Sequence, residues 1–187
     1  MVITVYSDRR VHDVTGVAEM LAEVIGERVR PRQVTLYIDR VASEARSRRK
    51  RAPVRRALPL NPVPALASAA EASDVTVLGV WGPVTEQVIT AFDLSRVVVL
   101  LTDATVTSLR AAQRTLKLCA GLGFGSDRIV VVKLVVDGHE DLEPAAVASA
   151  LKREIFGTLP SSANDATADR EAYQRLTSKL LGASGER

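Results

Sequence analysis

The loop at residues 7–16 carries side chains that could hold an anion or move a proton. It lies between an apolar, β-branched run that predicts a strand and apolar residues at helical spacing that predict a helix. Such a junction is where α/β proteins usually bind phosphate, because the helix N-terminus attracts negative charge. Arg9 and Arg10 could hold the anion, and His12 beside Asp13 could act as a base with its orienting carboxylate. No serine or cysteine nucleophile is placed beside that pair, so a solvated loop is the simpler interpretation.

A second candidate is a strongly basic segment. Its basic residues are seven of eleven consecutive positions: Arg46, Arg48, Arg49, Lys50, Arg51, Arg55 and Arg56. Eleven basic and three acidic residues give residues 27–56 a net charge of +8, which leaves −5 for the rest of a chain whose total is +3. The segment could neutralise several phosphates of a nucleic acid or lie on an anionic membrane surface. A solubilising loop is the alternative, and the run contains no aromatic residue to support base stacking.

Other residues with chemical potential have simpler interpretations. Cys119 lies on the apolar face of a predicted helix, so we expect a buried small hydrophobe rather than a reactive thiol. His139 is followed by Glu140 and Asp141, but no second group of ligands supports a metal site there. Trp81 follows a predicted strand, and we expect it to pack against the protein or to contact a partner.

Strands and helices alternate along the chain, and this order must position the candidate residues. The predicted strands cover residues 2–6, 33–39, 74–80, 96–102, 128–136 and 156–159. The predicted helices have apolar faces within residues 15–25, 64–72, 84–92, 105–122, 144–155 and 172–180. The alternation predicts an α/β fold, in which a three-layer, mostly parallel twisted sheet has helices on both faces. We expect one domain over residues 1–187, with the basic segment 41–57 as an exposed, mobile loop or a short surface helix.

Length and composition narrow the class of protein. The chain has 187 residues, of which 47% are hydrophobic and 25% charged, as in an ordinary globular domain with a proper core. No apolar run reaches the roughly 18 residues that a membrane helix needs, and Asp8, Arg9 and Arg10 interrupt any N-terminal signal. The one cysteine excludes an internal disulfide. We therefore expect a cytoplasmic protein that reaches the nucleoid or the membrane only through its basic segment.

The order of these signals resembles the ParA/MinD family of P-loop ATPases, especially the pilus-positioning branch called TadZ or CpaE. Residues 15–22 read TGVAEMLA, which is similar to the T-T-V-A-x-N-L-A run that opens the family's first helix. Asp39 lies near the family's acid after the second strand, and Asp74 before an apolar strand resembles the approach to Walker B. Residues 103–112 resemble the turn and helix after the next strand, and residues 157–160 resemble the family's G-x-I-P. The resemblance implies a P-loop fold of the ParA/MinD type.

The phosphate-binding loop departs from this family pattern. Aligned without a gap, residues 9–16 read RRVHDVTG against the family's K-G-G-V-G-K-T-T. All three glycines are replaced, and other residues do not freely adopt the positive φ angles that point successive N–H groups at a phosphate. Arg9 replaces the signature lysine, and Val14 replaces the lysine that grips the phosphate. Asp13 would add negative charge beside a phosphate, and Thr15 alone keeps a magnesium-side hydroxyl.

Two later positions of the implied nucleotide site also differ from the family. Gly79 replaces the Walker B aspartate, and Lys133 replaces the asparagine expected after the fifth strand, which reads adenine in the family. Together these losses remove the positioning and charge neutralisation on which phosphoryl transfer depends. We expect no catalytic residue, no metal and no cofactor; ATP and magnesium would bind only if the alignment were wrong. The vestigial nucleotide-binding residues are Arg9, Arg10, Asp13, Val14, Thr15, Asp39, Gly79 and Lys133.

Three functions are compatible with these patterns. The one we favour is a non-catalytic positioning or partition protein. It would form a homodimer through the face that carries the vestigial nucleotide-binding residues. Its basic segment would bind a protein partner, DNA or a membrane surface. The second is an active ParA/MinD-type ATPase in partitioning, septum placement or pilus assembly. The third is a receiver-like signalling domain, although Gly79 stands where the phosphoacceptor aspartate would be.

Overall fold

The computed structural model describes residues 1–9, 13–28, 34–38, 54–57, 75–136, 142–160 and 166–182. The strands in these ranges are β1 (Val2–Ser7), β2 (Val34–Ile38), β3 (Val54–Ala57), β4 (Val75–Trp81), β5 (Val97–Thr102), β6 (Ile129–Val135) and β7 (Ile155–Pro160). The helices are α1 (Val14–Arg28), α3 (Glu86–Leu94), α4 (Val106–Gly121), α5 (Pro144–Leu151) and α6 (Ala166–Gly182).

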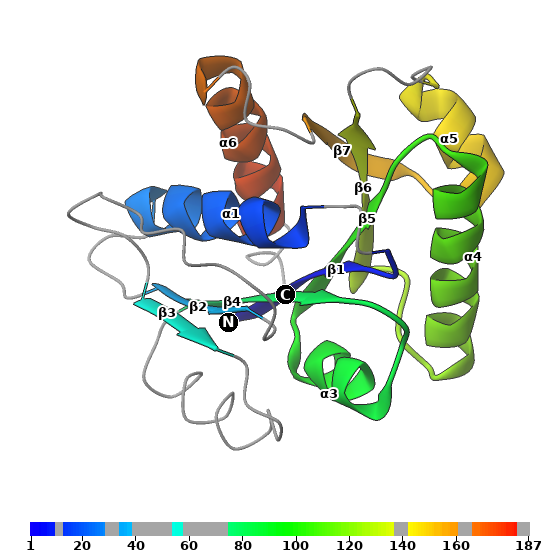
Figure 1. Ribbon diagram of the computed structural model, residues 1–187, viewed down its shortest axis with the longest axis horizontal. Helices are drawn as coiled ribbons and strands as arrows, with labels where there is room; N and C mark the ends of the chain where they lie inside the picture. Colours follow the sequence, from blue (N-terminus) through cyan, green and yellow to red (C-terminus); the bar gives the residue numbers. More distant parts are fainter. Residues whose placement is uncertain are drawn as a thin grey trace.

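All seven strands pair in parallel in one sheet, in the order β3-β2-β4-β1-β5-β6-β7. Helices α1 and α6 lie side by side on one face, and α3, α4 and α5 cover the other (Figure 1). The predicted fold class is therefore confirmed. The chain leaves the neighbouring strands β1 and β5 through helices on opposite faces, α1 and α4. In an open α/β sheet this arrangement produces a switch point, with a crevice at the carboxyl ends of the two strands.

The helices bury the apolar faces that their sequence spacing predicts. Helix α1 buries Leu21 and Ile25 in a core that also contains Leu176 of α6. Helix α4 buries Leu116 and Cys119 in the core of the opposite face. Burial of a large aliphatic side chain contributes on the order of 1.5–3 kcal/mol, so these faces hold the helices on the sheet. The same burial raises the pKa of the Cys119 thiol, in agreement with its interpretation as a buried hydrophobe.

The prediction for the basic segment is partly wrong. Residues 54–57 form β3, so Arg55 and Arg56 belong to a strand at the edge of the sheet, in register with Leu36 and Tyr37 of β2. These four residues show no apolar alternation, because an edge strand forms through backbone hydrogen bonds to a single neighbour and tolerates charged side chains. The rest of the segment lies outside the described residues, as does the helix predicted at residues 64–72.

The helix predicted to extend to Ile155 is shorter than expected. Helix α5 ends earlier, at Leu151, because Lys152 adopts the left-handed conformation with φ 52° and caps it. Ile155 then begins β7, the outermost strand on this side of the sheet. A lysine in this conformation gives no sequence signal comparable with a glycine, so the pattern of apolar residues extended the helix too far.

Candidate functional site at the switch point

The first wall of the crevice is the junction between β1 and α1. Asp13 precedes the first helical residue, and its Oδ1 accepts a hydrogen bond from the backbone N–H of Gly16 at 2.8 Å. This is the contact of an N-cap carboxylate, which satisfies one of the N–H groups that would otherwise attract an anion. A Cβ on Gly16 would stand 2.1 Å from Asp13 Oδ2. The glycine therefore makes room for the cap.

Close packing of α1 on β4 supports this junction from beneath. Val14, at the start of α1, is 2% exposed and belongs to the core. A Cβ on Gly79 of β4 would lie 3.2 Å from the Cβ of Ala18 and 3.7 Å from Val14 Cγ1. A carboxylate at Gly79 would therefore have to displace the helix. The two positions that the family resemblance assigns to a lysine and a metal-binding acid both lie in the interior, and the side chains packed around Gly79 are apolar.

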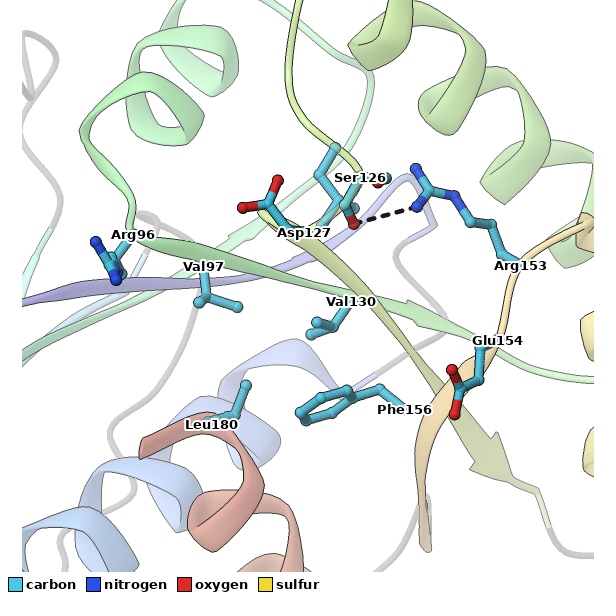
Figure 2. Close-up of a pocket in the computed structure, with 10 residues that line it drawn as sticks. Arg96, Val97, Ser126, Asp127, Val130, Arg153, Glu154, Phe156 and Leu180 are labelled. Atoms are coloured by element: carbon cyan, nitrogen blue, oxygen red, sulfur yellow. Dashed lines mark hydrogen bonds between the residues drawn. The ribbon is translucent and has the colours of Figure 1, made fainter. Parts of the chain in front are cut away.

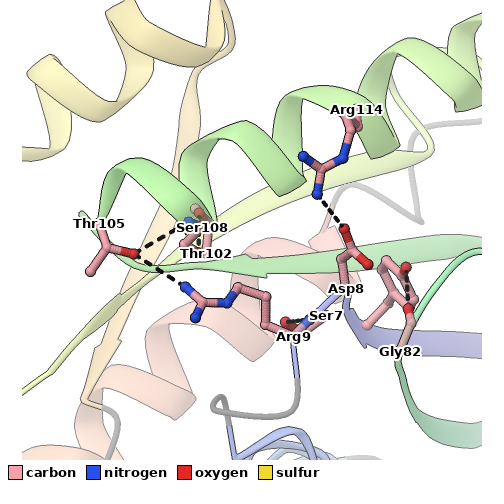
Figure 3. Close-up of polar contacts among 9 residues, drawn as sticks. Ser7, Asp8, Arg9, Gly82, Thr102, Thr105, Ser108 and Arg114 are labelled. Carbon is pink, nitrogen blue, oxygen red and sulfur yellow. Dashed lines mark hydrogen bonds and ion pairs between the residues drawn. The ribbon is translucent and has the colours of Figure 1, made fainter.

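The second wall is a polar network at the turn from β5 to α4 (Figure 3). Asp103 is 6% exposed, and its Oδ1 accepts hydrogen bonds from the backbone N–H of Thr105 at 2.8 Å and from its hydroxyl at 2.6 Å. Thr105 is the N-cap of α4, where its Oγ1 accepts from the N–H of Ser108 at 3.3 Å. Ser108 Oγ accepts from the N–H of Asp103 and lies 3.0 Å from Thr102 Oγ1. The chain's own side chains thus hold the start of α4.

Two polar contacts cross the crevice between these walls (Figure 3). Arg9 donates from Nη1 to Thr105 Oγ1 at 3.5 Å, and Arg114 of α4 pairs with Asp8 Oδ2 at 3.2 Å. The Arg114 side chain is 70% exposed, and a pair this exposed contributes at most about 1 kcal/mol. The contacts therefore tie the loop after β1 to α4 only weakly. Arg9, considered as an anion ligand from the sequence, contacts the N-cap of α4.

The structure brings only part of the predicted set together. Thr15 is half-buried in the first turn of α1, close to Asp13. Lys133 is 1% exposed inside β6, in register with Thr102 and Thr158, and so precedes the end of its strand. Trp81 ends β4 and packs half-buried against the core beneath α1. The predicted site residues outside the described ranges are Arg10, Asp39, Arg46, Arg48, Arg49, Lys50 and Arg51; His12 and His139 lie there too.

Two broader features bear on the chemistry of the molecule. Within the described ranges, no three histidine, cysteine, aspartate or glutamate side chains gather where they could hold a metal ion. Likewise, none of the helices in the described part combines the length and the apolar character that crossing a membrane requires.

Sequence reasoning missed the network at the start of α4 and the role of Gly16. One signal was available, because the order Asp103, Thr105, Ser108 is typical of a turn followed by a helix N-cap. The cross-crevice contacts gave no such signal, since Asp8 and Arg114 are 106 residues apart in the chain. Only the fold brings these two residues together.

Comparisons with solved structures identify proteins of the same architecture. A chain of the MinC:MinD cell division protein complex of Aquifex aeolicus aligns with a TM-score of 0.74 and 14% identity, over 97% of this chain and 95% of that one. MinD of Pyrococcus horikoshii complexed with Mg-ADP gives 0.73 and 13%, over 98% and 97%. A ParA family ATPase of Chlorobium tepidum gives 0.66 and 15%, over 99% and 93%. No sequence-family profile matches the chain, and no curated protein matches it.

Identities this low establish the fold alone. They confirm the ParA/MinD resemblance at that level, whereas membership of the TadZ/CpaE branch stays a prediction. Over nearly its whole length, the chain has the fold of the MinD and ParA ATPases.

Proposed function

We propose that this chain is a non-catalytic ParA/MinD-like positioning or partition protein, which has kept the fold and lost ATP turnover. The observation that carries the proposal is the hydrogen bond from Gly16 N–H to the carboxylate of Asp13. A fold of this kind offers phosphate the N–H groups at the start of this helix. In this chain a negative charge of its own occupies the helix start.

The electrostatics favour the same conclusion. Two like charges 4 Å apart repel by about 1 kcal/mol in water, and by about 4 kcal/mol at the effective dielectric constant near a protein surface. Each negative charge of a triphosphate beside Asp13 would add to this repulsion. Val14 has no charge to compensate this repulsion, and Gly79 has no side chain to bind magnesium. Both positions are packed in the interior.

A protein of this kind acts by binding. The similar fold found in the MinC:MinD cell division protein complex forms part of an assembly of two different proteins, and we propose a protein partner here as well. We further propose that two copies dimerise through the switch-point face. The basic residues between Arg46 and Arg56 would attach the dimer to DNA or to an anionic membrane surface, with an affinity that falls as salt rises.

The loss of turnover is tested by measuring phosphate released from ATP in the presence of magnesium, at increasing protein concentration. We expect no release above that of buffer. Release that rises in proportion to the protein in independent purifications would refute the proposal. It would favour the active ATPase instead.

The basic segment is tested by replacing Arg48, Arg49, Lys50 and Arg51 with serine. We expect retention on DNA or on anionic vesicles to be lost at low salt, with DNA and vesicles assayed separately. A matched control removes four exposed basic residues elsewhere, Arg110, Lys117, Lys152 and Arg175, and should keep retention. Equal retention by both variants would exclude the segment from the function.

A further inference from the structure

A cavity of about 270 Å³ opens at the end of the sheet where the strands begin, opposite the switch point. It lies at the amino ends of β5, β6 and β7, beside the last turn of α6 (Figure 2). Val97, Val130, Phe156 and Leu180 line it with apolar atoms. None of its lining residues takes part in the contacts of the switch-point crevice, so it is a separate feature of the molecule.

The apolar wall of this cavity is held in place by the core. Val97 and Leu180 are 7% and 1% exposed, and both belong to the core beneath α1 and α6. Lys179 Nζ donates to the backbone oxygen of Phe156 at 3.1 Å and lies 5.6 Å from the centre of its ring. A wall that is already ordered loses little entropy when a ligand binds, which favours binding in a small cavity.

Four charged residues line the cavity: Arg96, Asp127, Arg153 and Glu154. Asp127 already interacts with another residue, whereas Arg96 and Glu154 stand at opposite ends of the apolar wall (Figure 2). Both are exposed, and within the described ranges neither side chain forms a hydrogen bond or an ion pair. The second arginine, Arg153, differs because it donates to the backbone oxygen of Ser126 at 3.1 Å. Arg96 can therefore receive an anion, and Glu154 can receive a cation.

We propose that this cavity binds a small zwitterionic amphiphile of dipeptide size. Its carboxylate would pair with Arg96, its ammonium with Glu154, and its apolar side chains would pack on Val130 and Phe156. The cavity lies just below the range of about 300–1,000 Å³ that is usual for small-molecule sites, so the ligand must be small. A single amino acid carries its ammonium and its carboxylate on the same α-carbon. Arg96 and Glu154 stand at opposite ends of the apolar wall and therefore require a ligand with a charge at each of its two ends. The inference goes beyond the proposed function and does not depend on it.

The test uses the dipeptide leucyl-phenylalanine, titrated into the ¹⁵N-labelled full chain. We expect saturable shifts of the amides around residues 96–97, 126–130 and 154–156. Arg96→Gln should weaken binding about threefold to fivefold, as expected for an exposed ion pair, and leave the weaker affinity for the C-terminally amidated dipeptide unchanged. Glu154→Gln should give the same loss for the free dipeptide and none for its N-acetylated form. The control substitutions Arg110→Gln and Glu171→Gln, at exposed sites on α4 and α6, should have no effect.

Shifts that do not saturate at millimolar dipeptide would overturn the proposal. Equal losses for the free and the capped dipeptides in the Arg96 and Glu154 variants would also overturn it, because the charges would then not be paired as proposed. A third variant, Val130→Trp, fills the cavity and should abolish binding. The outcome does not hinge on this variant's folding, since Arg96 and Glu154 are exposed and their substitutions leave the core untouched.

Discussion

The two helices that begin at the switch-point crevice have carboxylates at their starts, but these carboxylates lie at different depths. Asp103, before α4, is 6% exposed and accepts hydrogen bonds from the backbone and the hydroxyl of Thr105. Asp13, before α1, is exposed and accepts from the N–H of Gly16. The start of α4 is therefore part of the structure of the domain. The start of α1 is capped by this surface contact, and β4 packs beneath it.

Under the proposed function, this difference would let the chain lose its binding chemistry and keep its fold. The exposed cap at Asp13 costs the fold little and repels an anion. At the interior position Gly79, α1 packs so closely that the Cβ of an acidic residue would press on Ala18. Substitutions at the two helix starts and in the strand beneath α1 should therefore differ in their effect on stability.

The largest effect is expected from Gly79→Asp, which introduces the acid that the family resemblance implies at this position. Its Cβ would stand 3.2 Å from Ala18, and the carboxylate would be buried, so we expect the free energy of unfolding to fall by about 3 kcal/mol or more. Urea denaturation measures the change. The control is Gly121→Asp, where nothing lies within 4 Å of the added Cβ, and it should change stability by less than about 1 kcal/mol. Equal losses in the two variants would show that α1 and β4 are not closely packed.

Asp103→Ala should have the next largest effect. It leaves the N–H and the hydroxyl of Thr105 without their buried acceptor, and we expect a loss of about 2 kcal/mol. Asp93→Ala, at an exposed position in α3, should stay within about 0.5 kcal/mol of the parent protein in the same urea titration. A loss at Asp103 no larger than that at Asp93 would contradict the structural role of the network.

Asp13→Ala should cost about 1 kcal/mol, the usual value of an N-cap, and therefore less than Asp103→Ala. Gly16→Ala adds a double-mutant test, because its Cβ would collide with the Asp13 carboxylate. Once Asp13 is alanine, Gly16→Ala should stabilise the protein by up to about 1 kcal/mol through helix propensity, and in the parent it should gain less or lose. Additive effects would mean that the carboxylate does not cap α1.

The smallest effect is expected from Arg114→Ala, which removes the exposed pair with Asp8. We expect a loss of less than about 1 kcal/mol that disappears at high salt. Thermal unfolding at low and at high ionic strength measures it. A large loss of stability that salt does not reduce would mean that the pair holds the loop after β1 firmly to α4.

The layers of the fold could be predicted from the sequence, because the residues that recur at helical or strand spacing are the ones that the structure buries. Residues such as Leu116 and Cys119 of α4 could be placed in the core from their spacing alone. The edge strand at Arg55 and Arg56 could not, since its order comes from pairing with β2 rather than from apolar alternation. At the candidate site, the sequence predicts that the glycines and the lysine of the family's loop are replaced, and this stays a prediction. The cap made by Asp13 on Gly16 could not be predicted, because it depends on a backbone arrangement that the motif itself does not specify.

The most direct test of the central claim is calorimetric titration of ATP into the purified full chain, with magnesium and with a chelator. We expect no saturable heat of binding at millimolar ATP under either condition, because a carboxylate and packed apolar side chains occupy the start of α1. Saturable binding that requires magnesium would contradict the claim.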